Sequence, residues 1–215
     1  MKIAALKKTY EKRLVLCTKE IDLPDGKIIS VIGTNGSGKS TFAKILCGII
    51  KDDNKTKPFE KKISVGYLPQ KPYAFNMSLE KNMNIAGEVS NEMYNQLKID
   101  QLRNENAKKL SGGETARMAL GRILAKDFDL LILDEMSAAM DIESTLLSEE
   151  LVRKYCEKNG ATILAITHEL KQARRLSDYI MFFDGGKMIA FGKTEEVLSN
   201  PEDERLKEFI RFYGA

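Results

Sequence analysis

The fold of this chain is decided by one stretch, Gly33-Thr34-Asn35-Gly36-Ser37-Gly38-Lys39-Ser40-Thr41. The stretch fits G-x-x-x-x-G-K-[ST], the pattern of the phosphate-binding loop. An apolar, β-branched run at 27–32 precedes it, as is typical of a buried strand, and apolar residues recur at helical spacing from Phe42 to Ile49. Because the loop lies between a predicted strand and a predicted helix, the sequence predicts binding of a nucleoside triphosphate.

The residue types in this loop suit a polyphosphate. Glycines let backbone N–H groups approach the anion closely, and the helix that begins near Lys39 points its positive dipole end at the same anion. We expect Lys39 to reach the β- and γ-phosphates and the Ser40 hydroxyl to ligate Mg²⁺. The alternative, a flexible Gly-Ser loop, leaves the Lys-Ser pair after the last glycine unexplained.

Two acids close another predicted strand. Residues 129–134 contain an aliphatic run and end in Asp134, which Glu135 follows. This pattern is typical of a buried parallel strand whose carboxyl end opens into a site. We expect Asp134 to hold Mg²⁺ through a water molecule and Glu135 to polarise the attacking water, with a solvated loop as the alternative.

Two further polar residues follow predicted strands. Gln70 comes after the strand at 63–68, and its amide can offer an oxygen to Mg²⁺ and a donor to water. His168 is the one histidine in the sequence and follows the strand at 161–167. Either residue alone is more often structural. Their place at strand ends beside a phosphate loop favours a role in the site.

A second glycine pair opens a helix at Leu110-Ser111-Gly112-Gly113-Glu114. Ser111 and Glu114 have the spacing of a capping box, which explains both residues structurally. The box does not explain the glycines, which weaken a helix start unless backbone must approach something. We therefore interpret the segment as a second anion site.

The remaining pattern predicts an α/β fold. A mainly parallel sheet flanked by helices forms its core, an antiparallel β subdomain precedes the phosphate loop, and a small helical subdomain covers about 78–109. A hairpin is expected over 179–191 and an amphipathic helix at the C-terminal end. Tyr10, in a predicted edge strand, could stack on a base or be a half-buried strand residue.

Composition bears on the partners and the location that we expect. The chain has 215 residues and a formal charge of +3 with acids and bases intermixed, so no nucleic-acid partner is expected. Three widely spaced cysteines without C-x-x-C pairing indicate reduced thiols and a cytoplasmic location. No signal-peptide pattern or membrane-spanning run is present in the sequence, so any membrane connection is expected to come through a partner.

Taken in order, these motifs resemble the nucleotide-binding subunit of an ATP-binding-cassette (ABC) transporter, and the resemblance covers 1–215 as one ATPase domain with a P-loop NTPase core. LSGGE is the decisive motif, because other phosphate-loop enzymes do not combine it with this loop. The matching residues are Tyr10 (adenine stacking), Gly33–Thr41 with Gly33, Asn35, Gly36, Ser37, Gly38, Lys39, Ser40 and Thr41 (Walker A), Gln70 (Q-loop), Leu110–Glu114 (signature), Leu130–Glu135 (Walker B), Ala138–Asp141 (D-loop) and His168 (switch).

The resemblance implies a mechanism shared between two subunits. Two cassettes, identical or different, pair head to tail, so that each ATP contacts one Walker A loop and the partner's Ser111, Gly112, Gly113, Glu114 and Asp141. Glu135 acts as the base on the lytic water and His168 contacts the γ-phosphate. The cofactors implied are ATP and Mg²⁺, with Ser40, Gln70 and Asp134 as the Mg²⁺ residues.

The resemblance also implies membrane partners. The chain is expected to drive transmembrane permease subunits from the cytoplasmic face of the membrane, with a solute-binding protein if it is an importer. The stretch from Gln70 to Asn82 and the ending at 200–205 resemble importers of oxyanions (phosphate, tungstate) or polar amino acids. The alternatives are a two-component exporter and a soluble ABC protein that acts on ribosomes or DNA.

The chain departs from the family pattern in the loop after Glu135 and in the length of two other segments. Met136-Ser137-Ala138-Ala139-Met140-Asp141 replaces the usual Pro-Thr-Ser-Ala-Leu-Asp, which puts the rigidity of this loop in doubt. Both the segment before Gln70 and the helical subdomain are short, so the interface with membrane subunits is expected to be unusual.

Overall fold

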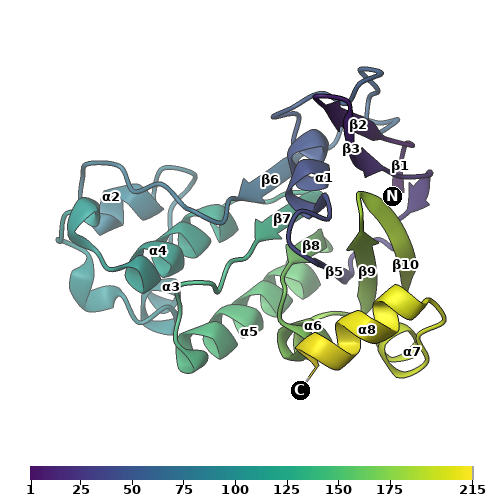
Figure 1. Ribbon diagram of the computed structural model, residues 1–215. Coiled ribbons are helices and arrows are strands. Elements are labelled where there is room, and N and C mark those ends of the chain that lie inside the picture. The colour runs from purple at the N-terminus through teal and green to yellow at the C-terminus, as the bar shows by residue number, and fades with distance from the viewer. Residues whose placement is uncertain (215) are drawn as a thin grey trace.

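The computed structural model describes residues 1–214, which form an eight-stranded sheet and a separate two-stranded sheet. The large sheet has the order β2-β3-β10-β9-β5-β8-β7-β6, and β1 pairs with β4 (Figure 1). The strands are β1 (Lys2–Ile3), β2 (Lys7–Tyr10), β3 (Arg13–Cys17), β4 (Ile21–Asp22), β5 (Ile28–Gly33), β6 (Val65–Leu68), β7 (Leu130–Asp134), β8 (Thr162–Ile166), β9 (Tyr179–Asp184) and β10 (Lys187–Lys193).

Five neighbouring strands, β9-β5-β8-β7-β6, run parallel to one another. Every residue of β5, β7 and β8 is buried, as expected for strands that are covered on both faces. The carboxyl ends of these strands therefore meet at one edge of the sheet, the position where ligands bind in open α/β sheets.

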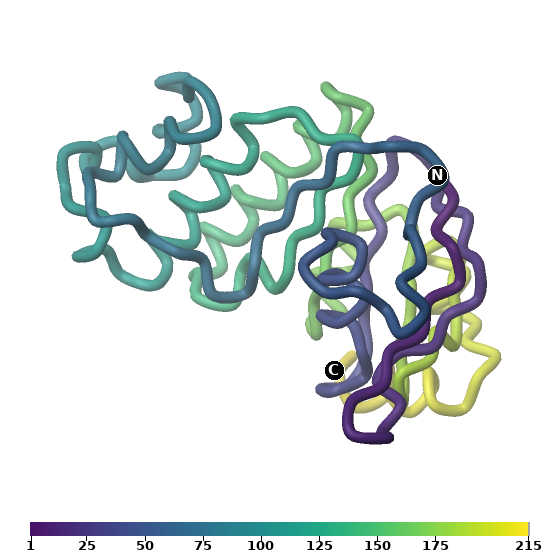
Figure 2. Tube along the Cα trace, turned by 90° about the horizontal axis from the view of Figure 1, so that it is seen from above, coloured from purple at the N-terminus to yellow at the C-terminus, as the bar shows by residue number. Residues whose placement is uncertain are grey.

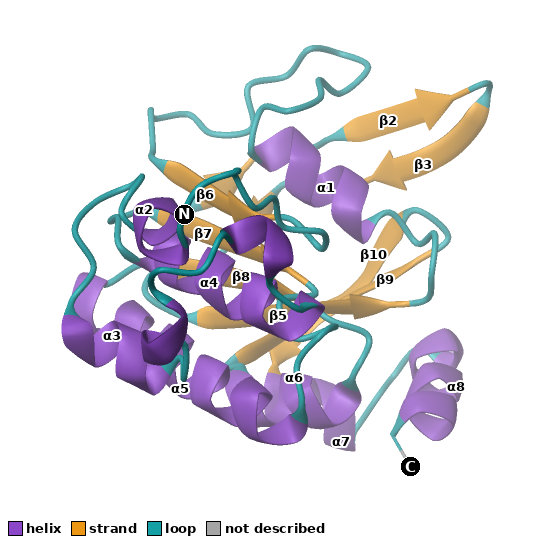
Figure 3. Ribbon diagram, turned by 90° about the vertical axis from the view of Figure 1, so that its left-hand side faces the viewer, coloured by secondary structure: helices purple, strands orange, loops and turns teal. Residues whose placement is uncertain are grey.

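Alternation along the strands divides the core into two layers. Ile29, Val31, Leu130 and Ile132 pack with α1 (Lys39–Leu46), whereas Ile28, Leu131 and Leu133 face the other side and pack with α4 (Gly112–Leu124) and α5 (Ile142–Asn159). Figure 3 shows α1 on one side of the sheet, with α5 and α6 (Leu170–Leu176) on the opposite side. The phosphate loop thus enters α1 at the sheet edge.

The antiparallel strands lie at the opposite end of the molecule from the helical segment (Figure 2). β2 and β3 form a hairpin, and β9 and β10 form the hairpin predicted over 179–191, which continues to Lys193. α7 (Thr194–Ser199) and α8 (Glu204–Tyr213) follow, and the buried Leu206 and Phe209 of α8 pack with Ile180 and Phe182 of β9.

The segment expected to be a helical subdomain contains two short helices and two 3-10 turns. These are α2 (Leu79–Met83), α3 (Asn91–Gln96), Asp100–Leu102 and Ala107–Lys109. α4 packs on α2, α5 and β6 and so joins this segment to the sheet. Among residues 1–214, no helix has the length and apolar character needed to cross a membrane.

The predicted fold class is confirmed, with two differences in the helices. The helix after the phosphate loop ends at Leu46 rather than near Ile49, because Gly48 takes a left-handed φ of 71° and ends the regular backbone. α5, the longest helix, was not predicted from the sequence, and neither were α6 and α7.

Candidate nucleotide site

The phosphate loop owes its shape to glycines that contact neighbouring backbone. A Cβ on Gly33 would lie 2.0 Å from the carbonyl oxygen of Phe183, and one on Gly38 would lie 2.5 Å from that of Val15. Gly36 meets nothing within 4 Å but has a φ of 77°, so its requirement is conformational. The loop is thus held between β3 and β9, with open space above Gly36 in which an anion could lie.

Lys39 is folded back onto this loop. Its ammonium group donates to the carbonyl oxygens of Gly33 at 2.8 Å and Thr34 at 2.9 Å, and the residue is 6 % exposed. Burial lowers the pKa of Lys39, while the nearby carboxylates of Glu135 and Asp134 act in the opposite direction. A cation held by neutral carbonyls beside an open loop is placed to transfer to a phosphate anion.

Asp134 lies at the carboxyl end of β7 and accepts a hydrogen bond from the Tyr67 hydroxyl at 3.0 Å. Burial raises the pKa of Asp134, and hydrogen bonds from Tyr67 and Ser40 act against that rise. Ser40, the predicted Mg²⁺ ligand, is therefore beside Asp134. Tyr67 was not among the predicted site residues. Its place two residues after Val65 in β6 gave no signal of its role, because the register of β6 on β7 decides the contact.

Glu135 takes a left-handed conformation, with φ of 50°, directly after β7. This backbone is uncommon for a non-glycine residue and indicates a constraint imposed by the site. The Glu135 carboxylate accepts from the Gln70 amide at 2.6 Å, and Nδ1 of His168 lies 3.5 Å from its other oxygen. Gln70 and His168 therefore meet at the carboxylate of Glu135, and these three predicted residues come from three different strand ends.

The helix at Gly112 begins with the expected capping box. The backbone N–H of Glu114 donates to the Ser111 hydroxyl at 3.3 Å, and the N–H of Ser111 donates to the Glu114 carboxylate at 2.8 Å. The hydrogen bonds of the cap occupy the Glu114 carboxylate and lower its pKa. This arrangement leaves the N–H groups at the start of α4 as the anion-binding feature.

Packing within the same chain also requires a glycine at position 113. A Cβ on Gly113 would lie 2.9 Å from the carbonyl oxygen of Ala139, whereas one on Gly112 would lie 3.5 Å from the Ala139 Cβ, an ordinary contact. The start of α4 therefore packs directly on the loop after Glu135. Only Gly112 is left without an intramolecular explanation.

Asp141 and Tyr10 lie away from the Glu135 cluster. Asp141 caps α5 by accepting from the Ser144 N–H at 2.7 Å, and this contact lowers the pKa of Asp141. Tyr10 is exposed at the end of β2, where the Lys8 ammonium lies 5.2 Å from the centre of its ring. Neither position is in contact with Glu135 in this structure.

The predicted residues thus form two groups. Lys39, Ser40, Gln70, Asp134, Glu135 and His168 gather at the sheet edge. The start of α4 borders a cavity of about 260 Å³ that Gln70, Glu135 and Gly112 line and that the phosphate loop does not reach. The first group can hold a triphosphate, a cation and a carboxylate base.

Comparison with known sequences finds a family and several related proteins. Residues 18–138 match the family described as ABC transporter. The chain is 36 % identical to the tungstate uptake ATP-binding protein of Peptoclostridium acidaminophilum over 86 % of this chain and 95 % of that protein. It is 31 % identical to the zinc import ATP-binding protein of Vibrio vulnificus over 99 % of this chain and 82 % of that protein.

Among solved structures, the fold is similar to that of a dimeric ATP-binding cassette in a post-hydrolysis state bound to ADP and Pi. The TM-score is 0.77 with 21 % identity, over 90 % of this chain and 98 % of that chain. At this identity the likeness concerns the fold.

Proposed function

This chain belongs to the ABC transporter family, and from that premise we propose that it is the ATP-hydrolysing subunit of an importer. It binds ATP and acts as an ATPase, as its family and its relatives do. The observation that carries the proposal is the gathering of Gln70, Asp134, Glu135 and His168 beside the phosphate loop. The residue roles that follow are part of the proposal.

The phosphate loop would hold the triphosphate. Lys39 would leave the carbonyls of Gly33 and Thr34 and bind the β- and γ-phosphates through its ammonium group. Asn35, Gly36, Ser37, Gly38 and Thr41 would supply backbone and side-chain donors around it. The exposed ring of Tyr10 would stack on the base.

The oxygen donors at the sheet edge fit Mg²⁺, which prefers carboxylate, hydroxyl and amide oxygens. Ser40, Asp134 and Gln70 would hold it. Gln70 gives its amide N–H to Glu135 and keeps its carbonyl oxygen for the cation. When bound, Mg²⁺ would neutralise part of the phosphate charge.

Glu135 would act as the general base. Its carboxylate lies between Gln70 and His168, so a water molecule held there can lose a proton to Glu135 as it attacks the γ-phosphate. Gln70 would orient the carboxylate, and His168 would contact the γ-phosphate. General-base catalysis of this kind contributes on the order of 10²–10⁴ in rate.

A second ABC subunit, identical or different, would complete the site. The start of α4 packs on its own D-loop and borders a cavity that the phosphate loop does not reach. Head-to-tail pairing would bring Ser111, Gly112, Gly113 and Asp141 of one subunit to the nucleotide of the other. Glu114 would serve this contact indirectly, as the cap of α4.

We further propose import of an oxyanion such as tungstate, at the cytoplasmic face of the cell membrane, with separate permease subunits and a solute-binding protein. The 36 % identity to a tungstate uptake protein over most of both chains supports this solute class. The zinc importer relative supports import without supporting an oxyanion. Export by a two-component transporter, or action on ribosomes or DNA, would give different partners on purification.

The proposed chemistry is tested with purified chain and Mg-ATP. Glu135→Gln keeps the shape and removes the base, so steady-state hydrolysis should fall about 10²-fold or more while ATP affinity is retained. Glu150→Gln, an exposed glutamate on α5, is the matched control and should hydrolyse at the wild-type rate. Wild-type turnover by Glu135→Gln would contradict the assignment.

The transport proposal needs a separate test. Native chain isolated from membranes should carry permease subunits, and a strain that lacks the chain should lose tungstate uptake while zinc uptake is kept. Recovery with ribosomes or nucleic acid would contradict transport. Loss of zinc uptake alone would contradict the oxyanion.

A further inference from the structure

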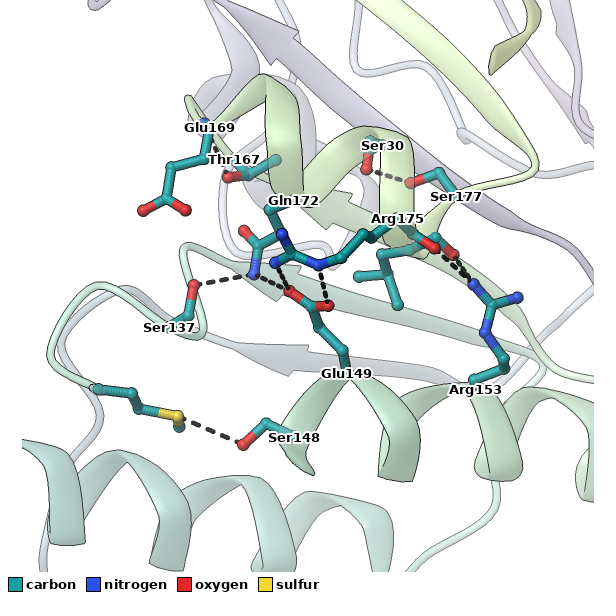
Figure 4. Close-up of polar contacts among 12 residues, drawn as sticks. Ser30, Ser137, Ser148, Glu149, Arg153, Thr167, Glu169, Gln172, Arg175 and Ser177 are labelled. Carbon is teal, nitrogen blue, oxygen red and sulfur yellow. Dashed lines mark hydrogen bonds and ion pairs between the residues drawn. The ribbon is translucent and has the colours of Figure 1, made fainter. Parts of the chain in front are cut away.

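A buried polar network joins the loop after Glu135 to α5 and α6 (Figure 4). Its centre is Gln172, on α6, which is 3 % exposed. The Gln172 amide nitrogen donates to the Ser137 hydroxyl at 2.9 Å and to the Glu149 carboxylate at 3.3 Å. Both amide protons are thus used on groups from two other elements, which fixes the orientation of the side chain.

Glu149 makes the network rigid. It lies on α5 at 6 % exposure, and its two oxygens accept from the Arg175 guanidinium at 3.0 Å and 2.7 Å. A two-pronged pair of this kind fixes both partners in one geometry, and the contact raises the pKa of Arg175. Gln172 therefore rests on a buried carboxylate that is itself held.

The network ties together the two sides of the proposed hydrolysis site. Ser137 follows Glu135 by two residues, and Gln172 follows His168 by four on the same connection into α6. The loop between Glu135 and Asp141 is a pair of turns, closed by Ala138 N–H to the Glu135 carbonyl at 3.1 Å and Met140 N–H to the Ser137 carbonyl at 2.9 Å. A movement of Ser137 is therefore transmitted to the backbone of Glu135.

This loop has no proline to stiffen it, and Glu135 holds an uncommon left-handed backbone. Such a conformation persists only when its surroundings hold it. The hydrogen bond from Gln172 to Ser137 and that from Ser148 to the Met140 sulfur at 3.3 Å anchor the loop to the helices, together with the packing of the buried Met136.

We propose that Gln172 is a positioning residue for ATP hydrolysis: through Ser137 it holds the Glu135 backbone in register with the segment that carries His168. The inference rests on the proposed function, because it assigns the reaction to Glu135. Gln172 does not touch the nucleotide loop, so it acts on the rate of the chemical step and leaves ATP binding unaffected.

The test is a double-mutant cycle on kcat in full-length chain. Gln172→Met keeps the size and removes both donors, while Glu149 keeps both bonds from Arg175. We expect kcat to fall about tenfold, since small misplacements of a catalytic group have effects of this size or larger. KM and the dissociation constant for ATP should stay within about twofold of wild type.

Ser137 provides the second arm. Ser137→Ala should lower kcat to the same extent, the double variant should be no slower than either single variant, and Ser137→Thr, which keeps the hydroxyl, should recover the rate. Multiplicative losses in the double variant, or a Ser137→Thr variant as slow as Ser137→Ala, would overturn the proposal.

Arg153→Ala is the matched control. Arg153 joins the same two helices by donating to the carbonyls of Arg175 at 2.8 Å and Leu176 at 3.0 Å, three and four residues after Gln172, and it donates no hydrogen bond to Ser137. It should lower thermal stability at least as much as Gln172→Met does and leave kcat unchanged. If Arg153→Ala loses kcat equally, general helix packing explains both variants and the positioning role fails.

The cycle separates this inference from the proposed function. Glu135→Gln is measured alongside it. If Glu135→Gln is inactive while Gln172→Met matches wild type, the positioning role is wrong and the base assignment stands. If Glu135→Gln turns over normally, the proposed function itself fails.

Discussion

Tyr67 and Asp134 show how a single residue can decide the chemistry of a buried acid. Asp134 is the last residue of β7 and is buried, and this burial raises its pKa. A carboxyl group that takes up a proton binds a cation less strongly, because it has lost its negative charge. The Tyr67 hydroxyl donates to the ionised form and opposes that rise, so it helps to keep Asp134 charged.

Replacing Tyr67 with phenylalanine should therefore weaken binding of Mg-ATP by about ten- to a hundredfold, the range that corresponds to one hydrogen bond to a charged group. The pKa of Asp134 should rise further without its donor. On acidification the variant should then lose Mg²⁺-dependent binding at a higher pH than wild type.

Titrating a fluorescent ATP analogue against pH, with Mg²⁺ and with EDTA, checks this. Affinity in EDTA should be unchanged, because Tyr67 makes no contact with the phosphate loop. Tyr73→Phe, at an exposed tyrosine, is the control. An equal loss of affinity in EDTA would show that Tyr67 supports the fold of the site and has no specific effect on Asp134.

The polar residues at strand ends could be placed from the sequence because of one geometric rule. Gln70, Asp134, Glu135 and His168 each follow a predicted parallel strand, and parallel strands end at one edge. Tyr67 and Gln172 could not be placed in this way. Their contacts depend on strand register and on how α6 lies against α5, which no local pattern encodes.

At the scale of elements, α4 begins with two glycines that differ in how closely the rest of the chain packs against them. Gly113 lies against the Ala139 carbonyl, so packing within the chain requires it. Gly112 has room for a methyl group, and its helical position would favour alanine. An alanine at each position can therefore separate folding from contact with a partner's nucleotide.

Gly113→Ala should destabilise the nucleotide-free chain by about 1–3 kcal/mol through overpacking. Gly112→Ala should leave stability unchanged or raise it by up to about 1 kcal/mol, and still impair ATP-driven dimerisation in the Glu135→Gln background. Thermal melts and analytical ultracentrifugation measure the two effects. Normal dimerisation by Gly112→Ala would remove Gly112 from the proposed contact.

α5 is the longest element that sequence reasoning missed, although it carried usable signals. Asp141 caps its start, Gly160 ends it in a left-handed conformation, and Leu151, Val152, Tyr155 and Cys156 recur at helical spacing. Its exposed face is strongly polar and interrupts the apolar pattern. The helix is stabilised by packing on α4 and the sheet, which are distant from it in the sequence.

At the scale of the whole molecule, the phosphate loop and the start of α4 lie on different parts of the chain. α1 packs on β3, β5 and β7, whereas α4 packs on α2, α5 and β6, and the two helices lie apart in Figures 1 and 2. A complete site would then require two subunits. Hydrolysis should depend on association, and defects in different motifs should complement one another.

Mixing two inactive variants tests this directly. Lys39→Ala disables the phosphate loop, and Gly112→Arg blocks the start of α4 in the partner. In an equimolar mixture half of the dimers are mixed and each holds one intact site, so we expect up to about a quarter of the wild-type rate if the sites act independently. Mixing Lys39→Ala with Lys39→Ala/Gly112→Arg leaves no intact site and is the control. If each site were built within a single chain, every subunit in the first mixture would remain defective and no activity would return.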